Sequence, residues 1–384
     1  MTDFIFNTTQ SIISAPGALS QLGEQCRIRQ LSRVLIVSDP TITQLGLLNK
    51  ALESLQAAAI SWVIYDQVIA DPPEHIVTEA LALAQSSCVE AVIGFGGGSS
   101  MDVAKVVALL YSGQQTLAEI YGVGNATACR LPLIQIPTTS GTGSEVTPVA
   151  IITTGETTKQ GIVATSLLPD LALLDAELTL GLPAPITAAT GIDAMVHAIE
   201  AYTSKIKKNP YSDMLAKEAL CIMHQHIATA VHQGDDIDSR TQMLYGATLA
   251  GQAFANAPVG AVHALAYPLG GRFHIPHGLS NSLVLPAVLR FNLAHARKEY
   301  AELATAMVPD IASQPEAERA LQLIELMQNL IAQVELPTRL GELNIPQDSL
   351  ATLAEDSMLQ QRLLMNNPRE LGYEDALSIY QSIY

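Results

Sequence analysis

The chain changes character near Pro183, and this change limits the folds that it can adopt. Before that point, short runs rich in β-branched residues alternate with helix-like stretches. The strand-like runs cover residues 33–39, 61–68, 91–98 and 131–139, and the helix-like stretches cover 43–58, 75–86 and 101–111. Alternation at this spacing predicts a mostly parallel sheet with helices on its faces.

Long segments rich in alanine and leucine follow Pro183. Examples are residues 188–203, 211–232, 238–256 and 314–334. Pro183 and Pro185 stand where a helix would begin, a position that proline favours. A chain of 384 residues also exceeds one ordinary hydrophobic core. We therefore expect an α/β domain over residues 1–182 and an all-helical domain over residues 183–384.

Composition excludes several classes of partner. The formal net charge of −17 argues against nucleic acid and anionic membranes, because both require clustered lysine and arginine. No apolar run reaches membrane-spanning length, and the first residues lack the layout of a signal peptide. The four cysteines are widely scattered, as expected for reduced thiols. These features predict a soluble, cytoplasmic protein.

A glycine-rich segment, GFGGGSSMDVAK over residues 94–105, follows one predicted strand and opens a helix. Its consecutive glycines would let a phosphate approach the backbone, and the helix N-terminus supplies N–H groups and partial positive charge. A tight strand-to-helix turn is the alternative, but it explains Gly-Gly-Gly-Ser-Ser less well. The ordinary GxGxxG dinucleotide fingerprint is absent.

A second polar segment, PTTSGTGSEVTP over residues 137–148, follows the next predicted strand. It offers the hydroxyls of Thr138, Thr139, Ser140, Thr142 and Ser144 to phosphate or ribose oxygens, unless it is an ordinary surface turn. Two such loops at neighbouring strand ends favour a dinucleotide, which parallel sheets bind at this edge.

Asp39 ends the strand-like run at residues 33–39. A carboxylate at such a position can accept hydrogen bonds from a ribose 2′-OH and would repel a 2′-phosphate. The position beside Pro40 fits an N-cap of the following helix equally well. The sequence leaves both interpretations open.

Four side chains in the second half predict a metal site. The segment GIDAMVHAIEAY places Asp193 and His197 on one face of a helix, where an unpaired carboxylate would be costly to bury. The apolar, glycine-rich residues 251–292 add His263 and His277, the latter in a Pro-His-Gly loop. Three imidazoles and one carboxylate suit Fe²⁺, Zn²⁺, Mn²⁺ or Co²⁺, acting as a Lewis acid on a substrate oxygen.

Together these motifs resemble the iron-containing (group III) alcohol dehydrogenases, which have the dehydroquinate synthase-like fold. The resemblance covers nearly the whole chain, including LLPDLALLDAEL, HALAYPLGGRFHIPHG and NPRELGYEDALSIYQSIY. It implies an NAD-dependent, metal-activated alcohol dehydrogenase or aldehyde reductase that acts on a small alcohol, usually with iron although zinc is possible. It also implies a homodimer.

The resemblance assigns site residues. The family's metal ligands fall on Asp193, His197, His263 and His277. Its cofactor contacts fall on Asp39, Asp71, Gly96, Gly97, Gly98, Ser99, Asp102, Thr138, Thr139, Thr142, Ser144 and Lys159. Phe254 and Tyr267 are candidates for the substrate pocket. Two positions depart from the family pattern: Tyr267 replaces a histidine often assigned to proton relay, and Asp71 replaces a common asparagine.

Two other functions stay open at this point. A lyase of the dehydroquinate synthase type would use NAD and a metal, but it needs lysine and arginine to hold a phosphorylated, carboxylated substrate. Residues 188–203 and 251–292 offer little beyond Arg272 and Arg290. A non-catalytic assembly protein of the same fold is the second alternative, and the complete sets of metal and phosphate residues count against it.

Overall fold

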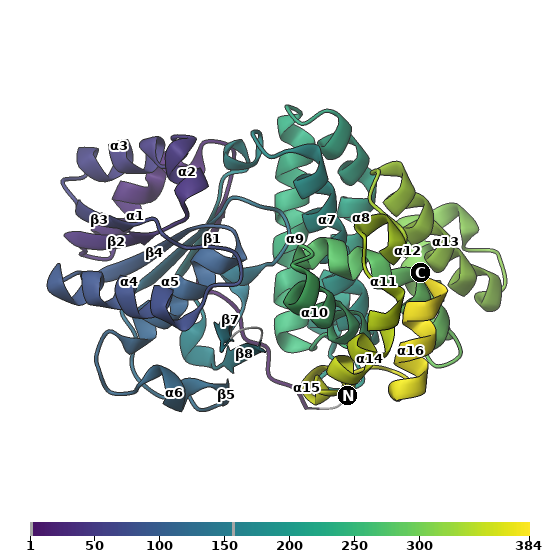
Figure 1. The fold of residues 1–384 in the computed structure, drawn as a ribbon. Helices are drawn as coiled ribbons and strands as arrows, with labels where there is room; N and C mark the ends of the chain where they lie inside the picture. Colours follow the sequence, from purple (N-terminus) through teal and green to yellow (C-terminus); the bar gives the residue numbers. More distant parts are fainter. Residues whose placement is uncertain (1–2, 156–157) are drawn as a thin grey trace. The chain divides into compact units, whose positions relative to one another are not determined.

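A computed structural model of the protein describes residues 3–155 and 158–384 (Figure 1). The chain divides into two compact units. One is Asn7–Leu180, and the other is Gly181–Tyr384 together with the described residues ahead of Asn7. The first unit is α/β and the second is helical, so the predicted fold class is confirmed.

A parallel six-stranded sheet forms the centre of the first unit. Its order is β1 (Ser11–Ser14), β9 (Leu171–Leu174), β6 (Leu133–Pro137), β4 (Ala91–Gly96), β2 (Arg33–Val37) and β3 (Ser61–Tyr65). Every residue of β4, β6 and β9 is buried, as is typical of parallel strands covered on both faces.

Helices cover both faces of this sheet. Apolar residues of α4 (Glu74–Ser86) and α5 (Gly98–Leu110) pack with Leu35 and Val37 of β2. Residues of α1 (Leu22–Ile28) and α3 (Asn49–Ala57) pack with the alternate residues Val34 and Ile36. Side chains that alternate along one strand therefore enter two separate cores.

The helix expected over residues 43–58 is two helices. α2 (Pro40–Gln44) ends before Gly46, and α3 begins at Asn49. Gly46 has φ +69°, a left-handed conformation that ends a helix and that glycine adopts without strain. The prediction of a single continuous helix was wrong because it ignored this glycine.

A second, three-stranded sheet extends the first unit. It pairs β7 (Val149–Thr154) with β8 (Thr158–Val163) in antiparallel fashion and β8 with β5 (Gly122–Val123) in parallel. Sequence analysis did not identify these strands, nor β1 and β9 of the main sheet. The unit also contains the short helix α6 (Leu117–Ile120).

The second unit contains ten α-helices and no β-strand among its described residues. They are α7 (Ala184–Thr203), α8 (Pro210–His232), α9 (Ile237–Asn256), α10 (Ala261–Phe273), α11 (His277–Asn292), α12 (Arg297–Met307), α13 (Glu316–Gln333), α14 (Leu350–Met358), α15 (Gln361–Leu364) and α16 (Tyr373–Ser382). Pro183 is the N-cap of α7 and Pro185 lies in its first turn, as predicted.

Helix α7 lies at the centre of this unit. Every residue from Gly191 to Thr203 is buried, and the helix packs against α8, α9 and α11. A Cβ atom at Gly191 would come within 2.8 Å of the side-chain ends of Ile227 and Met243, so glycine lets these two side chains pack close to α7. No helix of the described residues is both long and apolar enough to span a membrane.

Candidate active site

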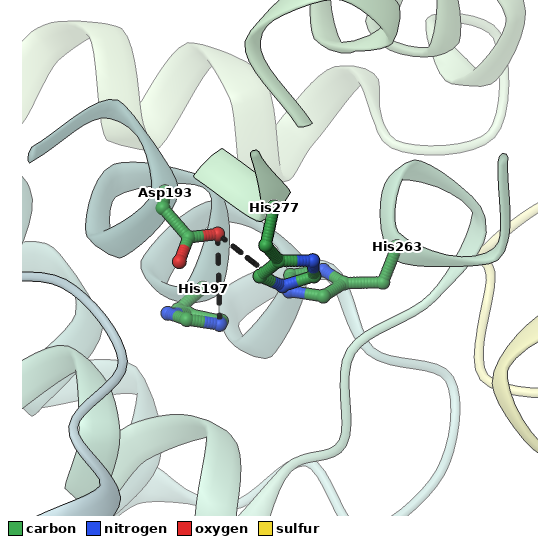
Figure 2. Close-up of side chains that lie close together, drawn as sticks. All are labelled: Asp193, His197, His263 and His277. Atoms are coloured by element: carbon green, nitrogen blue, oxygen red, sulfur yellow. Dashed lines mark ion pairs between the residues drawn. The ribbon is translucent and has the colours of Figure 1, made fainter. Parts of the chain in front are cut away.

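The four predicted metal ligands come together in the helical unit (Figure 2). Asp193 and His197 extend from α7, His263 from α10 and His277 from the start of α11. The Oδ1 atom of Asp193 lies 4.0 Å from Nε2 of His197, 4.0 Å from Nε2 of His263 and 3.7 Å from Nε2 of His277. One ligand atom from each residue lies within 4.8 Å of all the others.

Gly278 explains how the start of α11 can lie so close to α7. A Cβ atom at Gly278 would lie 2.3 Å from the carbonyl oxygen of Ala189 and 3.2 Å from Cβ of Asp193. Glycine therefore lets the first turn of α11 contact the backbone of α7. The prediction that His277 lies in a loop was wrong, because His277 is the first residue of α11 and Pro276 is its N-cap.

Spacing and protonation both fit a divalent transition-metal ion. Ligand atoms around an ion with bonds of about 2.1 Å lie about 3–4 Å apart, and the three distances from Asp193 to the imidazoles, 3.7–4.0 Å, fall in this range. Burial opposes the charge on Asp193, but the imidazoles of His197, His277 and His263 bring its pKa below the usual value. Burial, followed by the neighbouring imidazoles, lowers the pKa of His263 well below its usual value. An ionised carboxylate beside neutral imidazole is the state that binds metal.

The site has one exposed side. The side chains of Asp193, His197 and His263 are at most 6% exposed, whereas that of His277 is 34% exposed. The ring of Phe254 stacks on His197 at 4.4 Å between centroids, and the ring of Tyr267 lies 5.8 Å from that of His277. Both candidate substrate residues therefore border the metal ligands, and their contact with a substrate stays a prediction.

Two further residues of this site escaped sequence analysis. Glu200 lies 2.5 Å from Nδ1 of His263, and its other oxygen accepts a hydrogen bond of 2.7 Å from Val262 N. The Nδ2 group of Asn281 donates to Oδ1 of Asp193 at 2.6 Å. A signal for both existed, since Glu200 lies three residues after His197 and Asn281 lies four residues after His277 on their helices.

Glu200 fixes the orientation of one ligand. As a carboxylate it accepts the Nδ1 proton of His263, which leaves Nε2 of that ring as the lone-pair donor toward the ligand group. Glu200 is itself buried, and burial raises the pKa of its carboxyl to about 7 against the opposing effect of backbone N–H groups. This hydrogen bond gives the second carboxylate of α7 a role in orienting the ligand group.

The predicted cofactor residues lie in the α/β unit, where three neighbouring strands end. Parallel strands β2, β4 and β6 are adjacent, and Asp39, the glycines at 96–98 and the loop at 138–144 follow their carboxyl ends. Thr138 N donates to Gly96 O at 3.0 Å. A Cβ atom at Gly98 would lie 2.8 Å from Cγ2 of Thr142, so this glycine lets the two loops meet.

Asp39 is the N-cap of α2. Its Oδ1 accepts hydrogen bonds of 3.0 Å from Thr41 N and 3.1 Å from Ile42 N, which confirms the capping interpretation. The cap uses one carboxylate oxygen. The other, Oδ2, lies 3.4 Å from where a Cβ atom would stand at Gly96, so it faces the glycine loop. Capping and a contact with ribose are therefore compatible roles.

A buried lysine of α5 anchors the second loop and the residues that follow it. Lys105 Nζ donates to Ser144 Oγ at 2.7 Å, to Thr147 Oγ1 at 3.1 Å and to Val149 O at 2.7 Å. Asp102 accepts hydrogen bonds from Ser144 Oγ at 2.7 Å and from Ile151 N at 2.9 Å. Burial lowers the pKa of Lys105 to about 8. The polar groups of Asp102 and Ser144 thus hold the second loop in position, and sequence analysis missed the part played by Lys105.

The last two predicted cofactor residues form an ion pair. Lys159 Nζ lies 2.6 Å from Asp71 Oδ1, and Thr153 Oγ1 donates to Asp71 O at 2.9 Å. Asp71 has φ +52°, a left-handed conformation in which both asparagine and aspartate are enriched. Aspartate can therefore adopt the backbone conformation of this position as well as asparagine can.

Comparisons with known proteins cover both units. The family described as iron-containing alcohol dehydrogenase matches residues 9–176, and the C-terminal part of the Fe-containing alcohol dehydrogenase family matches residues 187–384. Long-chain-alcohol dehydrogenase 1 of Geobacillus thermodenitrificans is 38% identical over 371 residues, which are 96% of this chain and 93% of that protein. The 1,3-propanediol dehydrogenase of Klebsiella pneumoniae is 32% identical, with 96% of each chain covered.

Solved structures agree with these matches. A crystal structure of 1,3-propanediol oxidoreductase superimposes with a TM-score of 0.96 at 32% identity, covering 100% of both chains. The sulfoacetaldehyde reductase of Bifidobacterium kashiwanohense, solved in complex with NAD⁺, superimposes with a TM-score of 0.90 at 26% identity. That comparison covers 100% of this chain and 99% of the reductase.

Proposed function

Because this chain belongs to the iron-containing alcohol dehydrogenase family, we propose that it is an NAD-dependent, metal-activated alcohol dehydrogenase that also reduces aldehydes. The observation that carries the proposal is the convergence of Asp193 with three imidazoles at a partly exposed site. The natural substrate class is a small alcohol or its aldehyde, which is supported by the relative named for 1,3-propanediol, whereas another relative is named for long-chain alcohols.

Asp193, His197, His263 and His277 would hold the metal, which is Fe²⁺ with Zn²⁺ as the alternative. When bound, the ion supplies Lewis acidity toward the substrate oxygen, and NAD supplies the hydride acceptor. The protein orients the ligands through Glu200 and Asn281. Phe254, stacked on His197, shields one side of the ligand group from water.

The proposed cofactor site comprises the twelve residues that the resemblance assigned. In support, α5 begins at Gly98 beside the loop at 138–144, so its first N–H groups can donate to a phosphate. Asp39 Oδ2 faces the same glycines and would accept from a ribose hydroxyl, which favours NAD over NADP.

We further infer a cytoplasmic homodimer. The cysteines at 26, 88, 129 and 221 are free thiols, which fits a reducing compartment. A dehydroquinate synthase-like lyase is less well supported, because Arg272 pairs with Asp356 and Arg290 lines a hollow that contains none of the four predicted metal ligands.

The test is an NADH oxidation assay with a panel of aldehydes, run on protein purified without oxygen and analysed for metal content. We expect turnover of at least one small aldehyde that depends on bound iron or zinc. No turnover with any aldehyde or alcohol in metal-loaded protein would contradict the dehydrogenase and favour the lyase or the assembly protein.

Asp39→Asn is expected to shift cofactor preference toward NADPH. Asparagine keeps an oxygen for the α2 cap but removes the charge that repels a 2′-phosphate, worth on the order of 1–4 kcal/mol. The measurement is kcat/KM for NADH and NADPH, with Glu53→Gln on α3 as a control that removes an exposed charge. An unchanged ratio in Asp39→Asn would reduce Asp39 to a helix cap.

Tyr267→Phe is expected to lower kcat/KM about tenfold, the loss of about 1.4 kcal/mol of transition-state stabilisation. The reason is that the ring borders His277, where a phenol could hydrogen-bond the substrate or a water that carries its proton. Tyr245→Phe on α9 is the matched control. Unchanged kcat/KM and an unchanged pH–rate profile would leave Tyr267 as part of the pocket wall.

A further inference from the structure

The helical unit contains a cavity that the metal chemistry does not use. Its volume is about 550 Å³, within the range typical of small-molecule sites. α11, α13 and α16 line it, together with Thr338 and Arg339. None of the residues proposed to bind metal, cofactor or substrate lines this cavity.

The cavity has an apolar floor and a polar rim. Leu283, Ile331, Ile379 and Ile383 are buried and form the floor. Exposed side chains form the rim, among them Arg290, Arg339, Thr338 and Ser378. A hollow with an apolar floor and a few polar groups at one side matches the general anatomy of a ligand site.

The charged residues of the rim indicate the sign of the ligand's charge. Arg290 donates to the neutral side chain of Gln328 at 2.7 Å. Neither Arg290 nor Arg339 forms an ion pair with a carboxylate of the described residues. Asp375, the acidic residue of the lining, accepts from Gly372 N at 3.0 Å and lies 3.9 Å from Arg369. In a chain of net charge −17, two guanidinium groups without carboxylate partners at one cavity favour an anion.

Helix periodicity separates the cavity from the metal ligands. His277 and Asn281 lie one turn apart and face Asp193. Arg290 lies nine residues after Asn281, which is two and a half turns, so it lies on the opposite face of α11. Leu283 lies near that opposite face as well and contacts the cavity. One helix therefore separates two sites.

We propose that this cavity binds a small amphiphilic monoanion, specifically a medium-chain carboxylate. Its head group pairs with Arg290 and Arg339 through charge-assisted hydrogen bonds, for which the planar guanidinium is well suited. Its alkyl chain lies on the floor formed by Leu283, Ile331 and Ile379. The site is independent of the dehydrogenase activity, so either can fail without the other.

Calorimetric titration of the full-length protein with sodium octanoate tests the proposal. We expect one saturable site per chain and a loss of affinity of about tenfold in both Arg290→Gln and Arg339→Gln, the scale of a charge-assisted hydrogen bond. Arg297→Gln, which removes an exposed arginine of α12 outside the cavity, is the control and should bind like wild type. Octanamide, which has the chain without the charge and is neither an alcohol nor an aldehyde, should bind more weakly.

Ser378→Trp tests the place of binding without touching the core. Ser378 is exposed at the rim, so an indole there fills the hollow while the floor stays intact. We expect this variant to lose octanoate binding and to keep the wild-type melting temperature. Absence of saturable binding in wild type, equal binding of octanamide, or octanoate affinity unaffected by Arg290→Gln, Arg339→Gln and Ser378→Trp would each overturn the proposal.

Discussion

Replacing His263 by alanine is expected to lower kcat/KM at least about a thousandfold, because the several kcal/mol that a Lewis acid contributes would be lost. His263 is 2% exposed and stacks on His197, so the vacated space lies inside the ligand group. His277→Ala should have a similar effect. NADH affinity should stay within a few-fold, since the proposed phosphate loops belong to the other unit.

Elemental analysis, NADH fluorescence titration and steady-state kinetics on the same preparations distinguish the possible outcomes. The expected pattern is loss of metal and turnover with NADH binding retained. His295→Ala, an exposed histidine outside the ligand group, serves as the control and should behave like wild type. Variants that lack metal but turn over at the wild-type rate would contradict the assignment of the ligands.

Glu200→Ala is expected to weaken metal binding about 10–100-fold, the usual effect of removing a residue that orients a metal ligand. The side chain accepts from both His263 Nδ1 and Val262 N, so its loss leaves two buried donors without an acceptor. Glu200→Gln should also weaken binding, because an amide has only one acceptor atom for these two donors.

Competition with a chelator, using cobalt or zinc as the probe metal, measures this affinity apart from turnover. Activity of Glu200→Gln should recover in part at saturating metal, whereas that of His263→Ala should not. Glu318→Gln, an exposed glutamate on α13, is the control. Wild-type metal affinity in Glu200→Ala would show that the His263 ring is held by packing alone.

Sequence periodicity was sufficient to predict the main strands and the longest helices. The β-branched runs became β2, β3, β4 and β6, and the long alanine-rich segments became α7, α8, α9 and α13. The predicted strands extended too far toward the C-terminus. For example, β2 ends at Val37, and Asp39 is already the N-cap of α2. In the small sheet, β5 was missed because it has only two residues and pairs with a strand distant in the chain. β7 and β8 were missed although they pair with each other, and they lack the continuous burial of β4 and β6.

Prediction of the site residues from the sequence had a similar limit. Asp193 and His197 could be found because helical spacing alone puts them on one face. The sequence could not decide whether Asp39 caps a helix or faces a cofactor, since only the structure shows that its two oxygens point to different groups. Helical spacing places Glu200 near His197 and Asn281 near His277, but their hydrogen-bond partners lie on other helices, and periodicity does not report such contacts. The same holds for the contact of Lys105 with Ser144.

The concentration of metal-site residues on α7 links ion binding to folding. Asp193, His197 and Glu200 occupy two turns of a helix that is buried along most of its length, and the remaining ligands hold α10 and α11 against it. An ion bound there adds its binding free energy to the stability of the helical unit, about 2.7 kcal/mol at a free concentration one hundred times Kd. The α/β unit holds none of these ligands, so a bound ion does not stabilise it directly. The thermal stability of the helical unit would therefore depend on the metal-ion concentration, and that of the α/β unit on other solutes.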